Sequence, residues 1–249
     1  MNKIRRQLLT TFSFAGAGAL LIGCRGRHIG NTGVPAKDEN KEPAPGEATP
    51  VEVTATEDLM REHGILRRAL LVYRESAVKL RQDPAGVPAA ALEKTAQLFR
   101  VFGEDYHEKR LEEDYIIPLI RKVQGPAAAY ADVLLAQHAR GREITDYVLS
   151  VSKADRIASN QVEEVAKTLE AFVRMYEHHA AIEDTVVFPA WKAATGAQEY
   201  DELGDKFEEI ETETFGGDGF ESALKRMEDI ETSLGLNSLE MFTAPAPRK

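Results

Sequence analysis

The sequence predicts an all-α protein built on an antiparallel four-helix bundle of up-down-up-down topology, with additional C-terminal helices. From Thr54 onward, apolar residues recur every three or four positions, which is the period of an amphipathic helix. Glycine and proline separate these segments at helix-length intervals, and no segment shows the sustained alternation of a β-strand. Four such segments with short connections are typical of an up-down-up-down bundle.

The first helix is expected to begin after Thr54. Thr54 and Thr56, followed by Glu57-Asp58, form an N-terminal cap signal. An apolar stripe then runs from Leu59 to Val78, and Asp83-Pro84 is expected to end the helix. The segment is therefore predicted to bury one face in the core.

Three further helices complete the predicted bundle. The second follows a turn at residues 86–88, and Pro118 is expected to kink or shorten it near its end because proline has no amide hydrogen. The third spans about 125–151. A polar loop at 153–160 leads to the fourth, at about 162–189.

The remaining residues are expected to form a C-terminal helical extension. The bundle is assigned to 55–192 and the extension to 193–249, with an acidic helix at 199–213 and a second helix at 220–234. Between them, the run Gly216-Gly217-Asp218-Gly219 lacks the Lys-Ser/Thr of a P-loop and the spaced acids of an EF-hand. It is therefore predicted to be a turn.

Composition excludes several functional classes. The chain has 249 residues, and its net charge of −10 with no basic stripe argues against nucleic-acid binding. Its one cysteine, Cys24, rules out a disulfide framework and a thiolate zinc site. The protein is therefore expected to be a helical domain without nucleic-acid partners.

Residues 1–24 resemble an export signal with a lipobox. Arg5-Arg6 resembles a twin-arginine motif, and a short apolar stretch closes with Leu-Ile-Gly-Cys24. We expect Cys24 to be lipidated and to anchor the protein at the periplasmic face of a bacterial membrane. An ordinary cleaved signal with an incidental cysteine is the alternative. Residues 25–54, which include His28, read as a flexible linker, so His28 is not a candidate ligand.

Five of the six histidines lie in the four predicted bundle helices. They are His63, His107, His138, His178 and His179. His179 and Glu183 are four residues apart, so they share one helix face. A lone histidine on an apolar face is usually a packed core residue, but each buried polar group without a partner costs about 1–3 kcal/mol. Several imidazoles and carboxylates in one core therefore indicate a bound cation, and a metal-free helical adaptor is the alternative.

Several motifs resemble the hemerythrin-like (HHE cation-binding) family over about residues 55–192. The second and fourth are the most specific. The four motifs, in chain order, are Glu62-His63-Gly64, Tyr106-His107-Glu108-Lys109 with Glu112-Glu113-Asp114 and Pro118, Gln137-His138, and His178-His179 with Glu183-Asp184 and Phe188-Pro189. The resemblance implies a four-helix bundle with a non-haem di-iron centre, in which two carboxylates bridge the irons and imidazoles are terminal ligands.

Carried over to this chain, the resemblance implies six metal ligands. They are His63, His107, Glu112, His138, His179 and Glu183. Glu112 is favoured because it precedes Pro118 by six residues, as Glu183 precedes Pro189. Its five-residue step from His107 needs a local π-bulge or a relaxed rotamer. Glu108 and Glu113 remain alternatives to Glu112, His178 to His179, and Asp184 to Glu183.

One position departs from the oxygen-carrying hemerythrins. Those proteins carry two histidines four residues apart on the third helix, and here the position four after His138 is Arg142. A guanidinium cannot ligate a metal, so one iron would hold water or an exogenous ligand. Pairing of Arg142 with an acidic neighbour is the alternative. Tyr106 and Tyr176 are candidates to hydrogen-bond a bound oxygen species, or are ordinary core aromatics.

These features together predict a non-haem di-iron protein, with Mn/Fe as a second metal assignment. It would bind or sense oxygen, nitric oxide or peroxide, or handle iron, at the cell envelope. A di-metal oxidase or peroxidase with the same ligands is the alternative function. A ferritin-like enzyme is disfavoured because it needs two Glu-x-x-His motifs, and only Glu104 to His107 fits. The sequence identifies no redox partner.

Overall fold

The computed structural model describes residues 53–248, which form six helices, two of them changing helix type along their length. The first is α1 (Ala55–Gln82) and the third is α4 (Ala131–Val151). The second runs through α2 (Ala89–Leu98), η2 (Phe99–Ile116) and α3 (Ile117–Ile120), and the fourth through α5 (Val162–Ile182), η4 (Glu183–Val187) and α6 (Phe188–Ala194). They are followed by α7 (Ala197–Phe215) and α8 (Gly219–Leu234). Short 3-10 turns lie at η1 (Pro84–Gly86), η3 (Pro126–Tyr130) and η5 (Leu239–Phe242).

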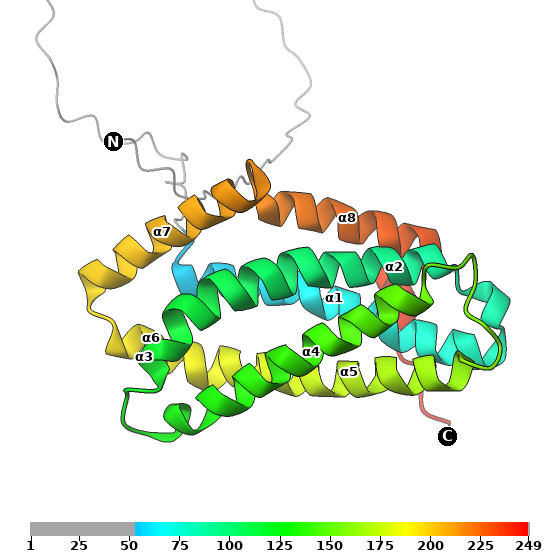
Figure 1. Cartoon of the computed structure of the whole chain (residues 1–249), viewed down its shortest axis with the longest axis horizontal. Coiled ribbons are helices and arrows are strands. Elements are labelled where there is room, and N and C mark those ends of the chain that lie inside the picture. Colours follow the sequence, from blue (N-terminus) through cyan, green and yellow to red (C-terminus); the bar gives the residue numbers. More distant parts are fainter. Residues whose placement is uncertain (1–52, 249) are drawn as a thin grey trace, which may run out of the picture. The chain divides into compact units, whose positions relative to one another are not determined.

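The first four helices pack as an antiparallel bundle, which confirms the predicted fold class (Figure 1). Within it, α1 packs along α5, and α2 packs along α4. Helices α7 and α8 lie across the face formed by α1 and the second helix (Figure 1). None of the helices in residues 53–248 is long and apolar enough to span a membrane.

The capping box predicted at the start of α1 is present. The backbone N–H of Thr54 donates to the Glu57 carboxylate at 2.8 Å, and the N–H of Glu57 donates to the Thr54 hydroxyl at 3.4 Å. Leu59 and Leu70 of the predicted stripe are buried, but Val78 is 44% exposed, so its place in the stripe was wrong. Over the last turns of α1 the buried face passes through Ala77 instead.

The second and fourth helices widen into π-helical turns before their prolines. The N–H of Ile117 donates to the carbonyl of Glu112, and the N–H of Phe188 donates to that of Glu183, each five residues back. Of the two alternatives offered for the step from His107 to Glu112, a local π-bulge or a relaxed rotamer, the second helix has the π-helical one, and it extends over all of Phe99–Ile116. The expected shortening at Pro118 also holds, since the helix ends at Ile120.

The glycine-rich run between α7 and α8 is a turn, as predicted. Gly216 ends α7 with φ 72°, in the left-handed region that favours glycine. Asp218 then caps α8, accepting a hydrogen bond from the N–H of Glu221 at 2.8 Å.

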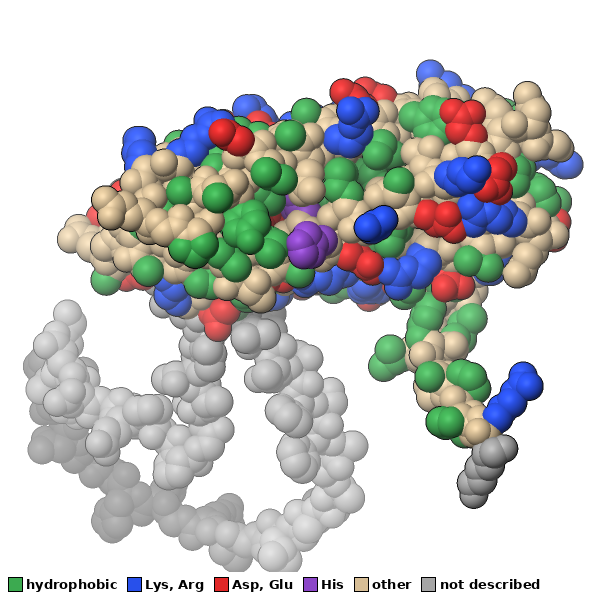
Figure 2. Space-filling view, turned by 90° about the horizontal axis from the view of Figure 1, so that it is seen from below, with side chains coloured by type: hydrophobic (Ala, Val, Ile, Leu, Met, Phe, Trp, Pro, Cys, Tyr) green, Lys and Arg blue, Asp and Glu red, His purple; other side chains and the backbone are tan. Residues whose placement is uncertain are grey.

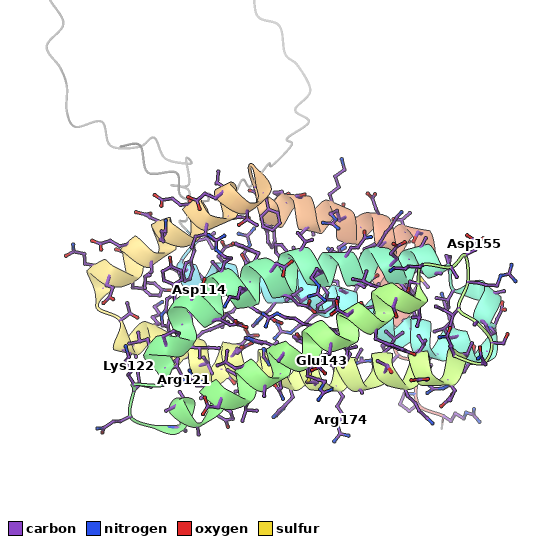
Figure 3. The ribbon with its side chains drawn as sticks, viewed as in Figure 1. Asp114, Arg121, Lys122, Glu143, Asp155 and Arg174 are labelled. Atoms are coloured by element: carbon purple, nitrogen blue, oxygen red, sulfur yellow. The ribbon has the colours of Figure 1, made fainter. Side chains whose placement is uncertain are left out.

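Aromatic side chains attach the C-terminal helices to the bundle. The ring of Phe215 lies 5.1 Å from Tyr106, and Phe207 stacks on Trp191 at 5.8 Å. The Tyr200 hydroxyl accepts a hydrogen bond from the N–H of Thr56 at the start of α1. Charged side chains such as Arg174 point away from the bundle into solvent (Figure 3). The apolar faces of α7 and α8 thus extend the bundle core.

Candidate metal centre

Four histidines, one from each bundle helix, meet in the core as two close pairs. In the first pair, Nε2 of His63 on α1 lies 3.0 Å from Nε2 of His107 on η2. In the second, Nε2 of His138 on α4 lies 3.2 Å from Nε2 of His179 on α5. Two imidazole nitrogens that bind one cation at about 2.1 Å and at right angles stand about 3.0 Å apart. Each pair therefore has the spacing of two ligands of one cation.

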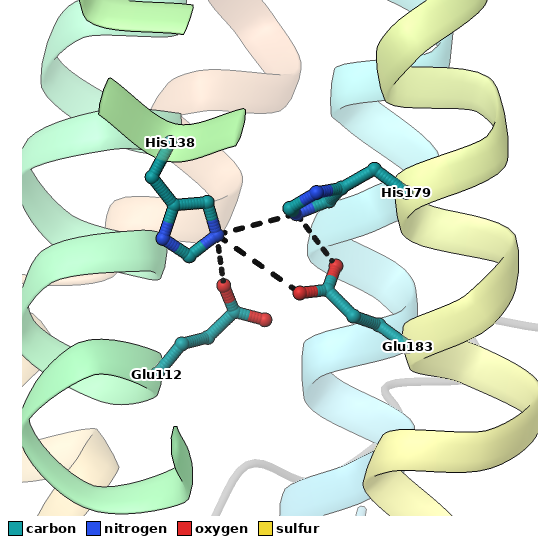
Figure 4. A group of neighbouring side chains, drawn as sticks. All are labelled: Glu112, His138, His179 and Glu183. Atoms are coloured by element: carbon teal, nitrogen blue, oxygen red, sulfur yellow. Dashed lines mark hydrogen bonds and ion pairs between the residues drawn. The ribbon is translucent and has the colours of Figure 1, made fainter. Parts of the chain in front are cut away.

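Two glutamates stand between the pairs and contact both. Glu112 places one oxygen 3.4 Å from Nε2 of His107 and the other 3.3 Å from Nε2 of His138. Glu183 lies 3.0 Å from Nε2 of His179 and 3.5 Å from Nε2 of His63. Figure 4 shows both glutamates with the second histidine pair. A carboxylate that reaches both pairs is placed to bridge two cations.

The centre is closed from solvent and lacks donors for its carboxylates. His179 is the most exposed of the six side chains, at 4%. Among the described residues, neither oxygen of Glu112 has a hydrogen-bond partner, and Oε2 of Glu183 has none. Burial raises the pKa of Glu183 well above its usual range, and the charge of Glu112 raises it further. Such a pair needs a cation or a proton to be stable in the core, so the residues present fit bound metal ions.

In each of the four histidines the other ring nitrogen, Nδ1, carries an N–H that donates a hydrogen bond to an oxygen acceptor. Such bonds fix the tautomer and aim Nε2 at a metal. The pairs are His63 with Asp184 at 2.7 Å, His107 with Glu62 at 2.6 Å, His138 with Glu113 at 3.2 Å, and His179 with Gln137 at 2.9 Å. Burial and the neighbouring His138 lower the pKa of His179 to about 4, so its imidazole is neutral and can bind a metal at neutral pH.

The alternative carboxylates lie outside the ring of Nε2 atoms. Asp184 and Glu113 accept hydrogen bonds from the outer nitrogens of the histidines, as described above. Glu108 is buried beside His138, but its oxygens contact the Tyr176 hydroxyl at 2.6 Å and the Arg142 guanidinium at 3.2 Å. Of the predicted carboxylates, only Glu112 and Glu183 stand between the two pairs.

Arg142 forms the ion pairs that the sequence left as its alternative role. Its Nη2 lies 2.8 Å from Glu113 and donates to the backbone carbonyl of Glu104 at 3.2 Å. The hydrogen bond from His138, together with the contacts with Lys109 and Arg142, lowers the pKa of Glu113 to about 2. The guanidinium thus supports the carboxylate that orients His138.

The two candidate tyrosines contact carboxylates at the edge of the centre. The Tyr106 hydroxyl donates to Glu62 at 3.0 Å, and the Tyr176 hydroxyl donates to Glu108 at 2.6 Å. A Cβ atom at Gly141 would lie 2.0 Å from the Tyr176 hydroxyl, so α4 needs glycine at this point. Tyr176 therefore reaches Glu108 only because α4 has no side chain there.

His178 lies apart from the centre. It is the exposed histidine among residues 53–248, whereas the other four are buried. Histidine reaches the surface in one small area of the face shown in Figure 2. Of the neighbouring pair on the fourth helix, the structure brings only His179 to the other ligands. Cys24 and His28 lie outside the described residues.

Two of the four acceptors that bond the Nδ1 atoms of the histidines were not predicted from the sequence. Glu62 and Gln137 each precede a site histidine in the chain, yet each bonds the histidine of another helix. The repeated Glu/Gln-His dipeptide was the available signal. Arg67, which pairs with Asp184, was also missed.

Comparison with known proteins gives one family and a set of close relatives. The hemerythrin HHE cation-binding domain model matches residues 54–191 and, in a second match, 131–235. Uncharacterized proteins of Mycobacterium bovis and of two strains of Mycobacterium tuberculosis are each 43% identical to this chain over 209 residues, covering 81% of both chains. No solved structure gives a significant match.

Proposed function

Because this chain belongs to the hemerythrin HHE cation-binding family, we propose that its four buried histidines and two central glutamates hold a non-haem di-iron centre. One observation carries the proposal. The Nε2 atoms stand 3.0 Å apart in the first histidine pair and 3.2 Å apart in the second, so each pair can hold one ion. Glu112 contacts a histidine of each pair, so it is placed to bridge the two ions. Glu183 repeats this placement from the opposite helix.

The donor set favours iron. Imidazole and carboxylate ligands suit iron, while affinity alone also admits manganese, so a Mn/Fe pair is the second assignment. A site built from several thiolates is excluded, because Cys24 is the one cysteine in the chain. Nitrogen and oxygen donors in a buried, acidic core support iron in both positions.

The proposed role is to bind or sense oxygen, nitric oxide or peroxide, or to handle iron. Two imidazoles and two glutamate oxygens would leave an iron ion short of six ligands, which would leave a position for a small molecule. Bound iron supplies redox chemistry and open coordination positions. The protein orients the imidazoles through Nδ1 and excludes bulk water, because no ligand side chain is more than 4% exposed. So closed a site favours ligands of two or three atoms.

A di-metal oxidase or peroxidase is the second candidate, and the Tyr176–Glu108 pair favours it. The Tyr176 ring lies 5.3 Å from that of His179, and its hydroxyl bonds a buried carboxylate that can accept a proton. A carrier or sensor binds peroxide without turnover. A peroxidase consumes peroxide, and an oxidase consumes oxygen, each with stoichiometric loss of an added reductant.

We further propose that the protein is exported and anchored by lipid on Cys24 at the periplasmic face of the membrane. The twin-arginine-like start and the Leu-Ile-Gly-Cys24 run support this proposal. Cys24→Ala should release the protein into the soluble envelope fraction with its iron content unchanged. Retention of the variant in carbonate-washed membranes would contradict the lipid anchor.

The function is tested by loading the protein with Fe²⁺ without oxygen and measuring bound iron. Two iron ions per chain are expected, and nitric oxide should change the absorption spectrum. His107→Ala should lose iron and weaken the nitric oxide response, whereas His178→Ala should match the wild type, because His178 is exposed. A wild-type protein that retains no iron, or whose iron is unaffected by His107→Ala, would contradict the proposal.

A further inference from the structure

The metal centre is built twice, by two related halves of the chain. Each half supplies a histidine with an arginine four residues after it. Each half also supplies a glutamate that is followed directly by a second acidic residue and, six residues after the glutamate, by a proline. The first set is Glu62-His63, Arg67, Glu112-Glu113 and Pro118, and the second is Gln137-His138, Arg142, Glu183-Asp184 and Pro189.

The contacts repeat as the motifs do. Asp184 accepts from Nδ1 of His63 and pairs with Arg67, which follows that histidine by four residues. Glu113 likewise accepts from Nδ1 of His138 and pairs with Arg142. In each case the accepting carboxylate belongs to the residue directly after a central glutamate, on a different helix from the histidine. One half of the centre is therefore a close copy of the other.

Among the four acceptors behind the imidazoles, one differs in charge between the halves. Glu62 is 1% exposed, and its carboxylate accepts from Nδ1 of His107 at 2.6 Å. At the equivalent place the neutral amide of Gln137 accepts from Nδ1 of His179 at the longer distance of 2.9 Å. A carboxylate behind a metal-bound imidazole makes it a stronger donor to the metal, and an amide does so less. His179 is thus the most weakly supported of the four imidazoles.

Glu108 does not restore this balance. It adds a buried carboxylate on the His138 side, but its oxygens contact Tyr176 and Arg142. Neither oxygen accepts a hydrogen bond from His179, whose Nδ1 is occupied by Gln137. The charge of Glu108 is also offset by the nearby Arg142 guanidinium. Glu108 therefore does not replace the charge that the Gln137 amide lacks behind His179.

We propose that the two cation positions are unequal and that Gln137 is the positioning residue that makes them so. The position between His63 and His107, with a carboxylate behind each imidazole, binds the first and tighter cation. The position between His138 and His179 binds the second and more weakly held one. This inference rests on the proposed two-metal function and adds an order of filling to it.

The test is a titration of metal-free, full-length protein with Zn²⁺, followed by calorimetry. Two binding steps are expected, with dissociation constants that differ by about 10–100-fold, the usual effect of changing such an outer hydrogen bond. The order of filling is read from nitrogen-15 histidine spectra, in which one equivalent of Zn²⁺ should shift His63 and His107 before His138 and His179.

Two variants of nearly unchanged shape exchange the acceptors. Gln137→Glu should lower the dissociation constant of the second step and so narrow the difference between the two dissociation constants. Glu62→Gln should raise the dissociation constant of the first step. The double variant should restore a gap with the order of filling reversed, which a merely structural role of either residue would not produce. Gln97→Glu, which adds the same charge at an exposed position on α2, should leave both steps unchanged.

Two equal steps in the wild type, or a gap that Gln137→Glu leaves intact, would overturn the inference while the two-metal function stands. An absence of Zn²⁺ binding in the wild type would instead overturn the proposed metal centre, and this inference with it.

Discussion

Replacing Gly141 by alanine should destabilise the protein, although alanine is the better helix former. Gly141 lies within α4, and a Cβ atom there would stand 2.0 Å from the Tyr176 hydroxyl and 2.9 Å from the ring carbon that carries it. No real Cβ contact is so short, so Tyr176 must move. Its hydroxyl donates to the buried Glu108 at 2.6 Å, and the movement breaks this bond.

The size of the effect follows from these contacts. Overpacking a core costs about 1–3 kcal/mol, and a lost hydrogen bond to a charged group costs about 1.5–3 kcal/mol. The helix propensity of alanine over glycine returns about 1 kcal/mol. Gly141→Ala should therefore lower the free energy of unfolding by about 2–4 kcal/mol.

Urea denaturation of the metal-free protein measures this change. Gly64→Ala is the matched control, because Gly64 is an exposed helical glycine with open space around it, and it should be neutral or stabilising by up to about 1 kcal/mol. Removing the clashing hydroxyl with Tyr176→Phe should cost less in the Gly141→Ala background than in the wild type. Equal stability of the two glycine variants, or simple additivity in the double variant, would refute the reasoning.

Two further predictions concern buried carboxylates. Glu183→Ala should lose more iron than His179→Ala in metal analysis, because Glu183 contacts both histidine pairs; near-full iron in the Glu183 variant would count against the bridge. Burial raises the pKa of Glu104 from 4.5 to about 7. The Glu104 carboxyl therefore keeps its proton to a higher pH in the folded protein than in the unfolded chain, and the free energy of unfolding falls as the pH rises from 4.5 to about 7. Glu104→Gln cannot lose such a proton, so from pH 5 to pH 8 the wild type should lose up to about 3 kcal/mol relative to the variant. Parallel pH profiles in urea denaturation would contradict this.

The fold, and the residues that meet in the candidate centre, could be predicted because their signals are local. Cap residues, helical periodicity and prolines mark where the helices begin and end. The equal spacing of Glu112 and Glu183 from their prolines singled out Glu112, and its five-residue step from His107 called for a π-bulge or a relaxed rotamer; the second helix is π-helical over this step. Val78 shows the limit of such patterns, since an apolar residue near the stripe was wrongly placed on the buried face.

The supporting contacts could not be predicted because they join residues far apart in the chain. Glu62 adjoins His63 in sequence but bonds His107, 45 residues away. The need for glycine at 141 depends on where Tyr176 of another helix places its hydroxyl. The Glu-His dipeptide marks Glu62 but does not show which histidine it bonds, and Gly141 has no local signal, because both contacts depend on how two helices are rotated against one another.

Anomalous diffraction at the iron absorption edge, on crystals of the iron-loaded protein, tests the central claim most directly. Two peaks about 3.5–4 Å apart are expected, one beside His63 and His107, the other beside His138 and His179, with Glu112 and Glu183 between them. A single peak, or a peak beside Glu108 and Glu113 instead, would contradict it.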